Sequence, residues 1–347
     1  MAYHLVNGIM RLDDGSTVTL DGKFVFVSQD RFLQDVCRGE CCFICLAHPG
    51  KKPFNDEHVL PNWILGWQKL HGQSINLPDG SKHPYSSYKL PCCQACNTMM
   101  GKLFENPISH LFKTSIATAL HGPGGSERAM RLFQWMSLIF VKVHLLDRKL
   151  YGEGRAGFDW IDIHHPYSVA RAFTSGVGLS SHILGSMWLL ELPQDDDAEP
   201  FDYIDVTRSQ TMMLRVGRNA CIAVLNDCCA VLGALRLPSI SWNPKNANLQ
   251  LREIVARIAY VNAQLRERPV FHTQWHTEGS GFLIDVKLPL HPQFNEDDPL
   301  LYGQFLNFLL REPLGLDERD DEDPVKRTVL EGRLSFLEPD GGASVAE

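Results

Sequence analysis

Residues 37–45 read CRGECCFIC, and residues 92–96 read CCQAC. Each stretch contains a CxxC pair, Cys42–Cys45 in the first and Cys93–Cys96 in the second. A two-residue spacer lets both sulfurs of one turn reach the same ion, and four thiolates suit tetrahedral Zn²⁺. The sequence therefore predicts a structural zinc site that joins two distant segments of the chain.

Neighbouring cysteines leave the ligand set open. Cys41 precedes the first pair and Cys92 precedes the second, so either could replace its neighbour. Buried free thiols are the alternative interpretation, since they are common in protein cores. In a reducing compartment, paired cysteines indicate metal before disulfide. The three cysteines outside these two stretches have no such spacing and are expected to be core thiols: Cys221, Cys228 and Cys229.

The composition favours a soluble chain with a large core. The chain has 347 residues, 44% of them hydrophobic, which is enough for two domains. The net charge is −8, but residues 312–347 hold 11 acidic and 4 basic residues and contribute −7 of it. The other residues are nearly neutral, so a nucleic-acid partner is neither indicated nor excluded.

No targeting or membrane segment is expected. The N-terminus lacks the charged leader and apolar stretch of a signal peptide. The most apolar run, residues 132–146, is too short to span a bilayer and contains Lys142 and His144. The sequence predicts a cytoplasmic protein without membrane contact.

The segment between the CxxC pairs carries the candidate chemistry. Residues 57–61 read EHVLP, and the second CxxC is followed at once by Asn97. Neighbours on an extended strand point to opposite faces, so Glu57 and His58 can serve two different atoms. A helix is expected to start near Asn97 and to end at Pro107.

This order of elements resembles the HNH endonuclease family, the ββα-metal nucleases. In that family a strand carries an acidic residue and a histidine in the pattern [D/E]H-x-x-P, and a zinc-type CxxC leads into a helix that starts with His or Asn. The resemblance covers residues 37–110. It implies an α+β fold, with a small zinc-stapled ββα-metal module followed by a larger mixed α/β regulatory or targeting domain.

The resemblance implies a role for three residues. His58 would be the general base, because a neutral imidazole accepts a proton near pH 7. Glu57 and Asn97 would hold a catalytic Mg²⁺ or Mn²⁺, which prefers hard oxygen ligands. Asp56 is a rival ligand on the opposite face, and Asn97 could instead be a helix N-cap. Glu105 is expected at a solvated or packing position.

One element of the family pattern is missing. Many members have an asparagine on the second strand that orients the base histidine through its backbone carbonyl. Here residues 83–93 read HPYSSYKLPCC, without asparagine, and Ser86, Ser87 or Tyr88 stands in its place. Nucleic acid would be held through phosphates, with three lysines as candidate contacts: Lys51, Lys52 and Lys102.

The predicted domains are a β-hairpin region at 1–36, the HNH module at 37–110, an α+β domain at 111–312, and an acidic, mobile tail at 313–347. A central helix is expected at 126–152. In the later part, strands are expected at 201–207, 211–217, 220–225 and 281–290, and helices at 251–265 and 299–310.

The resemblance predicts a metal-dependent HNH endonuclease, a phosphodiester hydrolase that nicks or cuts double-stranded DNA. Family context adds a role in prokaryotic antiviral defence, with protein partners from a multi-gene system. The first alternative is a catalytically silent, zinc-stapled module that binds DNA or protein, which the missing asparagine favours. The second alternative is a nuclease directed at RNA.

Overall fold

The computed structural model describes residues 4–6, 9–76, 82–114, 116, 120, 124–151, 161–175, 178–179, 185–193, 201–235, 237, 240–276, 281–289 and 291–337. The chain divides into two compact units, Met1–Leu184 with Val270–Lys287, and Gly185–Pro269 with Leu288–Glu347. Helices and strands occur in both units, which confirms the predicted α+β class. The first unit extends far beyond the predicted boundary at residue 110, because two long core helices belong to it.

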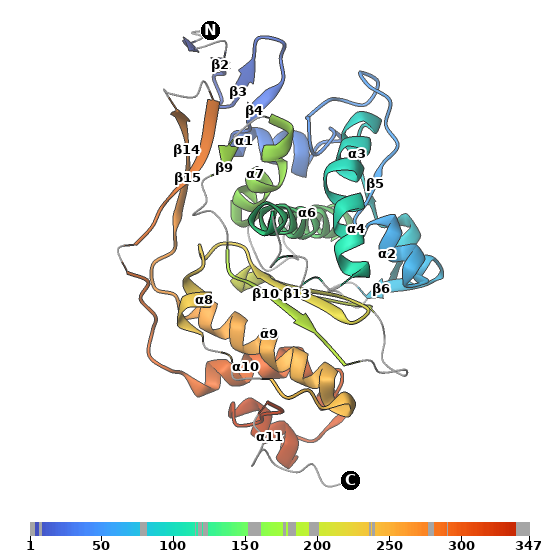
Figure 1. Cartoon of the computed structure of the whole chain (residues 1–347), viewed down its shortest axis with the longest axis vertical. Helices are drawn as coiled ribbons and strands as arrows, with labels where there is room; N and C mark the ends of the chain where they lie inside the picture. Colours follow the sequence, from blue (N-terminus) through green and yellow to red (C-terminus); the bar gives the residue numbers. More distant parts are fainter. Residues whose placement is uncertain are drawn as a thin grey trace. The chain divides into compact units, whose positions relative to one another are not determined.

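The first unit begins with a small antiparallel sheet (Figure 1). Its strands follow chain order: β1 (His4–Val6), β2 (Ile9–Arg11), β3 (Thr17–Thr19) and β4 (Phe24–Phe26). The predicted hairpin is confirmed, since β2 pairs with β3 across a turn in which Gly15 has a φ of +83°. That left-handed backbone favours glycine because it lacks a Cβ atom.

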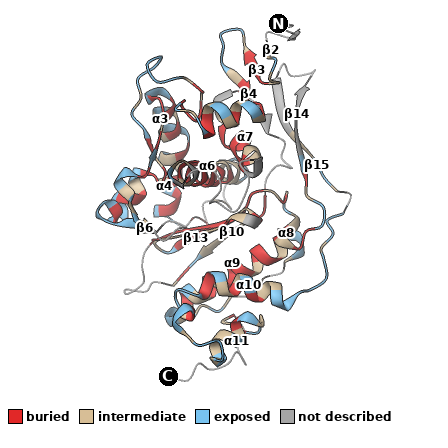
Figure 2. Ribbon diagram, turned by 180° about the vertical axis from the view of Figure 1, so that it is seen from behind, coloured by how far each residue is buried: buried red, intermediate tan, exposed pale blue. Residues whose placement is uncertain are grey.

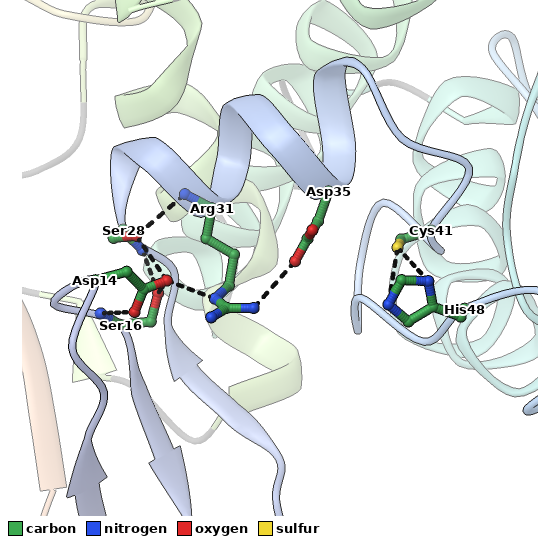
Figure 3. A network of polar contacts seen from close by, with 7 residues as sticks. All are labelled: Asp14, Ser16, Ser28, Arg31, Asp35, Cys41 and His48. Carbon is green, nitrogen blue, oxygen red and sulfur yellow. Dashed lines mark hydrogen bonds and ion pairs between the residues drawn. The ribbon is translucent and has the colours of Figure 1, made fainter. Parts of the chain in front are cut away.

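Figure 3 shows how the N-terminal hairpin is joined to the segment that follows it. Asp14 accepts hydrogen bonds from Ser16 and from Arg31, whose Nε lies 2.6 Å from the carboxylate. Ser28 caps the short helix α1 (Gln29–Arg31), which continues as a π-helical segment (Phe32–Cys37). These contacts lead the chain from the sheet directly to the first cysteine cluster.

Two long helices form the centre of the first unit. They are α6 (Gly125–Tyr151) and α7 (Ile161–Ser175), and they pack against each other. Most of α6 is buried (Figure 2). By length and composition its segment Gly125–Asp147 could cross a membrane, but 78% of the tested window lies buried, which fits the core helix of a soluble protein.

A three-stranded sheet completes the first unit. Its strands are β9 (Gly178–Leu179), β14 (Val270–His276) and β15 (Gly281–Lys287). Strand β15 pairs antiparallel with β14 and parallel with β9, so two segments about a hundred residues apart share one sheet. The strand predicted at 281–290 is confirmed as β15.

The second unit is an antiparallel sheet packed against helices. The strand order is β10 (Met187–Glu191), β13 (Asn219–Val224), β12 (Thr211–Val216) and β11 (Phe201–Val206). The helices are α8 (Ala230–Ala234), α9 (Ala247–Ala263), α10 (Pro299–Leu310) and α11 (Pro324–Leu330). Apart from the short α8 and α11, each of these elements except β10 was expected from the apolar spacing of its residues.

The C-terminal segment differs from the predicted mobile tail. Val329, Leu334 and Leu337 are buried within the same apolar cluster as α9 and α10. Glu253 of α9, which is fully buried, accepts hydrogen bonds from the Ser335 hydroxyl and the Phe336 backbone N–H. The segment 313–337 is therefore packed on the second unit through its buried apolar side chains, and the predicted tail beyond 337 lies outside the described residues. Charged residues dominate this segment, so its apolar residues did not predict a packed structure.

Candidate functional site: a four-cysteine cluster beside His58

The four sulfurs of the two CxxC pairs come together in space. Those of Cys42, Cys45, Cys93 and Cys96 all lie within 4.8 Å of one another, and the Cys45 and Cys93 sulfurs are 3.7 Å apart. Four sulfurs about 2.3 Å from a tetrahedral zinc ion form a tetrahedron with edges of about 3.8 Å. The donor set and spacing therefore fit Zn²⁺, as the sequence predicts.

The local backbone presents each CxxC pair on a turn. In the first, the Leu46 N–H donates to the Cys42 carbonyl, and Leu46 adopts a left-handed φ of 59°. In the second, Cys93 is the N-cap of α3 (Gln94–Met100), which places Cys96 one turn into that helix. Hydrogen bonds from the neighbouring thiols lower the pKa of Cys42, so the cluster favours at least one thiolate.

The structure also separates the ligands from their neighbours in the chain. The Cys41 sulfur lies 3.4 Å from His48 Nδ1 and outside the cluster (Figure 3). The Cys92 sulfur is 3.9 Å from that of Cys42 but does not belong to the mutually close group of four. Burial and Asp35 raise the pKa of Cys41, as expected of a thiol that stays protonated. The open choice between adjacent cysteines is thus decided for Cys42 and Cys93.

His58 lies on a two-stranded antiparallel ladder next to the cluster. Strand β5 (Glu57–His58) pairs with β8 (Lys89–Leu90), with Glu57 opposite Leu90 and His58 opposite Lys89. Directly opposed residues share a face of the ladder. Glu57 and Leu90 are buried, whereas His58 is half-buried and Lys89 is exposed. Burial, followed by the nearby Lys89 charge, lowers the pKa of His58, so its neutral form is favoured.

Glu57 points into the core rather than toward solvent. It is 5% exposed, and its Oε1 lies 2.8 Å from Nζ of Lys142, a residue of α6 that is only 1% exposed. The same ammonium donates to the backbone carbonyl of His58 at 2.8 Å. Lys142 was missed as a site residue. Its signal in the sequence is its position inside an otherwise apolar run, 132–146.

Glu105 lies beside Glu57. Burial raises the pKa of its carboxyl to about 7; Lys142 opposes this shift, and the charge and hydrogen bond of Glu57 add to it. The sequence suggested a solvated or packing position for this residue. Two carboxyl groups therefore meet one ammonium, and the raised pKa of Glu105 allows a proton to balance the second carboxyl near pH 7.

Asn97 is tied to the segment that carries Glu57 and His58. Its Nδ2 donates to the Asp56 carbonyl at 2.9 Å and to Asn55 Oδ1 at 3.1 Å. Cys93, four residues earlier, is the N-cap of α3, so the alternative that Asn97 caps this helix is wrong. Asp56, the rival metal ligand, is exposed and has a left-handed φ of 48°.

The helix after the second knuckle is longer than predicted. α3 runs into a π-helical segment (Gly101–Glu105) and then into α4 (Asn106–Lys113). Pro107 does not end the helix; it lies in the first turn of α4. A proline is tolerated there because first-turn N–H groups need no helical partner.

Of the three lysines predicted to contact nucleic acid, one has a local role at the cluster. Lys52 Nζ lies 3.8 Å from the Cys45 sulfur, whose negative charge raises the pKa of this ammonium. Lys51 and Lys102 are exposed. The lysine that lies directly beside His58 is Lys89, across the β5–β8 ladder.

No protein-family model, curated protein or solved structure matches this chain. Among the described residues, one group of three or more His, Cys, Asp or Glu side chains could hold a metal ion. This group is the four-cysteine cluster. Any function must therefore be argued from this cluster and from the residues next to it.

Proposed function

We propose that the chain is a metal-dependent endonuclease that hydrolyses phosphodiester bonds of DNA, with His58 as the general base. The observation that carries the proposal is the linkage of His58 to the four-cysteine cluster. Phe54 bridges to Cys93, and the Asn55 N–H donates to the Cys92 carbonyl at 3.2 Å. These contacts connect the segment before His58 with the second CxxC turn, which supports the proposal.

The environment of His58 suits a general base. Its lowered pKa keeps the imidazole neutral at pH 7, ready to accept a proton from an attacking water. The exposed ammonium of Lys89 on the same face offers a positive charge to a phosphate. The four-cysteine cluster would have a purely structural role, because its bound ion would hold the two CxxC turns together.

Glu57 and Asn97 would hold the catalytic Mg²⁺ or Mn²⁺, and Glu105 adds a second carboxyl beside Glu57. These are oxygen donors, which such cations prefer. When bound, the cation supplies charge stabilisation to the phosphoryl oxygens. Glu57 lies on the buried face of the ladder in an ion pair with Lys142, so a bound cation would share this carboxylate with the ammonium.

A specific observation favours the second candidate, a catalytically silent module that binds DNA or protein. The Lys142 ammonium already neutralises Glu57, so the core holds the carboxylate whether or not a cation is bound.

In the first candidate the chain would act in the cytoplasm of a prokaryote, in antiviral defence with protein partners. The experiment below separates the two candidates.

The test is nicking of a supercoiled plasmid by the zinc-loaded protein with Mg²⁺ or Mn²⁺. We expect His58→Ala to lower the rate by about 10²–10⁴-fold, the contribution of a positioned base. His110→Ala is the matched control, because His110 is an exposed histidine of α4 in the same unit. Excess EDTA should abolish cutting.

Each other outcome has a defined meaning. Plasmid binding without cleavage under either cation would leave the silent module as the function. Cleavage of single-stranded RNA but not of DNA would assign the activity to RNA. Cleavage that survives His58→Ala would overturn the role of this residue.

A further inference from the structure

We propose that Lys142 is the positioning residue for His58, reaching the β5 strand from helix α6, outside the HNH-like segment. The inference rests on the proposed nuclease function, because it concerns how the base of that reaction is held. Lys142 would hold the backbone of the base in a chain that has no second-strand asparagine to orient the imidazole.

The contacts of Lys142 are specific to one strand. Its Nζ lies 2.8 Å from the His58 carbonyl oxygen and 2.8 Å from Glu57 Oε1. These two residues make up the whole of β5. The ammonium therefore fixes both the backbone of the proposed base and the side chain that precedes it.

The burial of Lys142 needs a physical reason. It lies on α6 between the buried Val141 and Val143 and is 1% exposed itself. Removing an ammonium from water is costly even after relaxation, and replacing a whole buried ion pair by apolar side chains of similar volume is often neutral for stability. A lysine here is therefore better explained by the geometry it imposes on β5 than by stability alone.

A second contact joins α6 to the other side of the ladder. Asp147 of α6 accepts a hydrogen bond from the hydroxyl of Tyr88, which is buried and directly precedes β8. The Tyr88 carbonyl in turn accepts from the Val59 N–H at 2.9 Å. A two-residue ladder is too short to be rigid alone. Helix α6 thus holds both of its strands, one through Lys142 and the other through Asp147.

Loss of this support should affect the chemical step more than substrate binding. The surface that would meet phosphates, His58 and Lys89, lies on the opposite face of the ladder from Glu57. A shift of the base by about 1 Å can slow a reaction by about 10²-fold while contacts to the substrate remain. The expected signature is a fall in kcat with little change in KM.

The experiment compares Lys142→Met and Lys142→Gln with the wild type in plasmid nicking with Mg²⁺. We expect Lys142→Met to lower kcat by about 10–100-fold and to change KM less than about threefold, with zinc content retained. Lys142→Gln keeps an N–H donor for the His58 carbonyl and should lose less. Lys149→Met is the control, since Lys149 also lies on α6 and donates to a backbone carbonyl, that of Gly39 at 2.6 Å.

The outcomes distinguish this inference from the proposed function. A wild type that fails to cut ends the proposed function and the inference together. An active wild type with unchanged kcat in a folded, zinc-loaded Lys142→Met overturns the inference alone. If neither variant retains zinc, Lys142 is a folding residue, and the positioning role is likewise overturned.

Discussion

At the scale of single residues, two pairs of adjacent cysteines are divided between different roles. Cys42 and Cys93 contribute to the cluster, whereas Cys41 lies against His48 and Cys92 is a buried neighbour. The residue types are identical, so the side-chain chemistry cannot distinguish them. The turn of the backbone at each knuckle decides which sulfur faces the shared centre.

The cysteine assignment is testable by zinc content. We expect Cys93→Ser to lose the bound zinc, because three thiolates remain and metal binding supplies much of the folding energy of small zinc units. Cys92→Ser is the matched control, being the same substitution one residue earlier, and should keep about one zinc per chain. The measurement is elemental analysis of the purified proteins. Equal loss from both variants would contradict the assignment.

At the scale of elements, long helices stabilise short strands and turns that would not be stable alone. Arg171 of α7 is 3% exposed and donates to the carbonyls of Phe24, Val25 and Ile44. The first two belong to β4, and Ile44 lies between the cysteines of the first knuckle. One side chain therefore ties the N-terminal sheet to the metal-binding turn, as Lys142 ties α6 to β5.

Replacement of Arg171 tests how much these hydrogen bonds contribute to stability. We expect Arg171→Met to lower the free energy of unfolding by about 3 kcal/mol or more, because two buried carbonyls and one half-buried carbonyl lose their donor. Arg131→Met is the control; its ion pair with Glu127 is exposed, and such pairs contribute about 0.5 kcal/mol. Denaturant unfolding of both variants gives the comparison. A change below about 1 kcal/mol for Arg171→Met would show that this contact is not needed.

At the scale of the whole molecule, the two units are not consecutive in the chain. The segment Val270–Lys287 belongs to the first unit, although the residues on both sides of it belong to the second. The C-terminal residues return to the second unit, where α11 and the segment after it complete the apolar cluster around α9. The acidic end of the chain is therefore part of the fold up to residue 337.

Truncation after Leu316 tests whether the C-terminal segment is structural. It removes Val329, Leu334 and Leu337, and each buried side chain of this size contributes about 1.5–3 kcal/mol. We expect the second unit to lose most of its stability, since whole domains are stable by only about 5–15 kcal/mol. Limited proteolysis and denaturant unfolding measure the loss.

A point substitution in the same segment provides the control. Leu330→Ala lies on α11 but is 39% exposed, so it should cost less than about 1 kcal/mol. If the truncated chain unfolds at the same denaturant concentration as the full chain, the segment does not belong to the core.

The sequence by itself determined many of the elements and the metal-binding pairs. Apolar spacing predicted α6, α9, α10 and most strands of the second unit, because a local pattern decides which face of an element can be buried. The CxxC spacing likewise predicted the four-sulfur cluster, since two cysteines of one knuckle are placed by a single turn. The proposed roles of Glu57, His58 and Asn97 rest on the same local motif.

Only the tertiary structure decided which distant residues surround that motif. Lys142 is 85 positions from Glu57 along the chain, and nothing local to either residue indicates their ion pair. The same holds for Glu105 beside Glu57 and for the boundary between the two units. Such contacts arise when long helices pack against short strands, and packing depends on the whole chain, so a spacing rule within one segment cannot predict it.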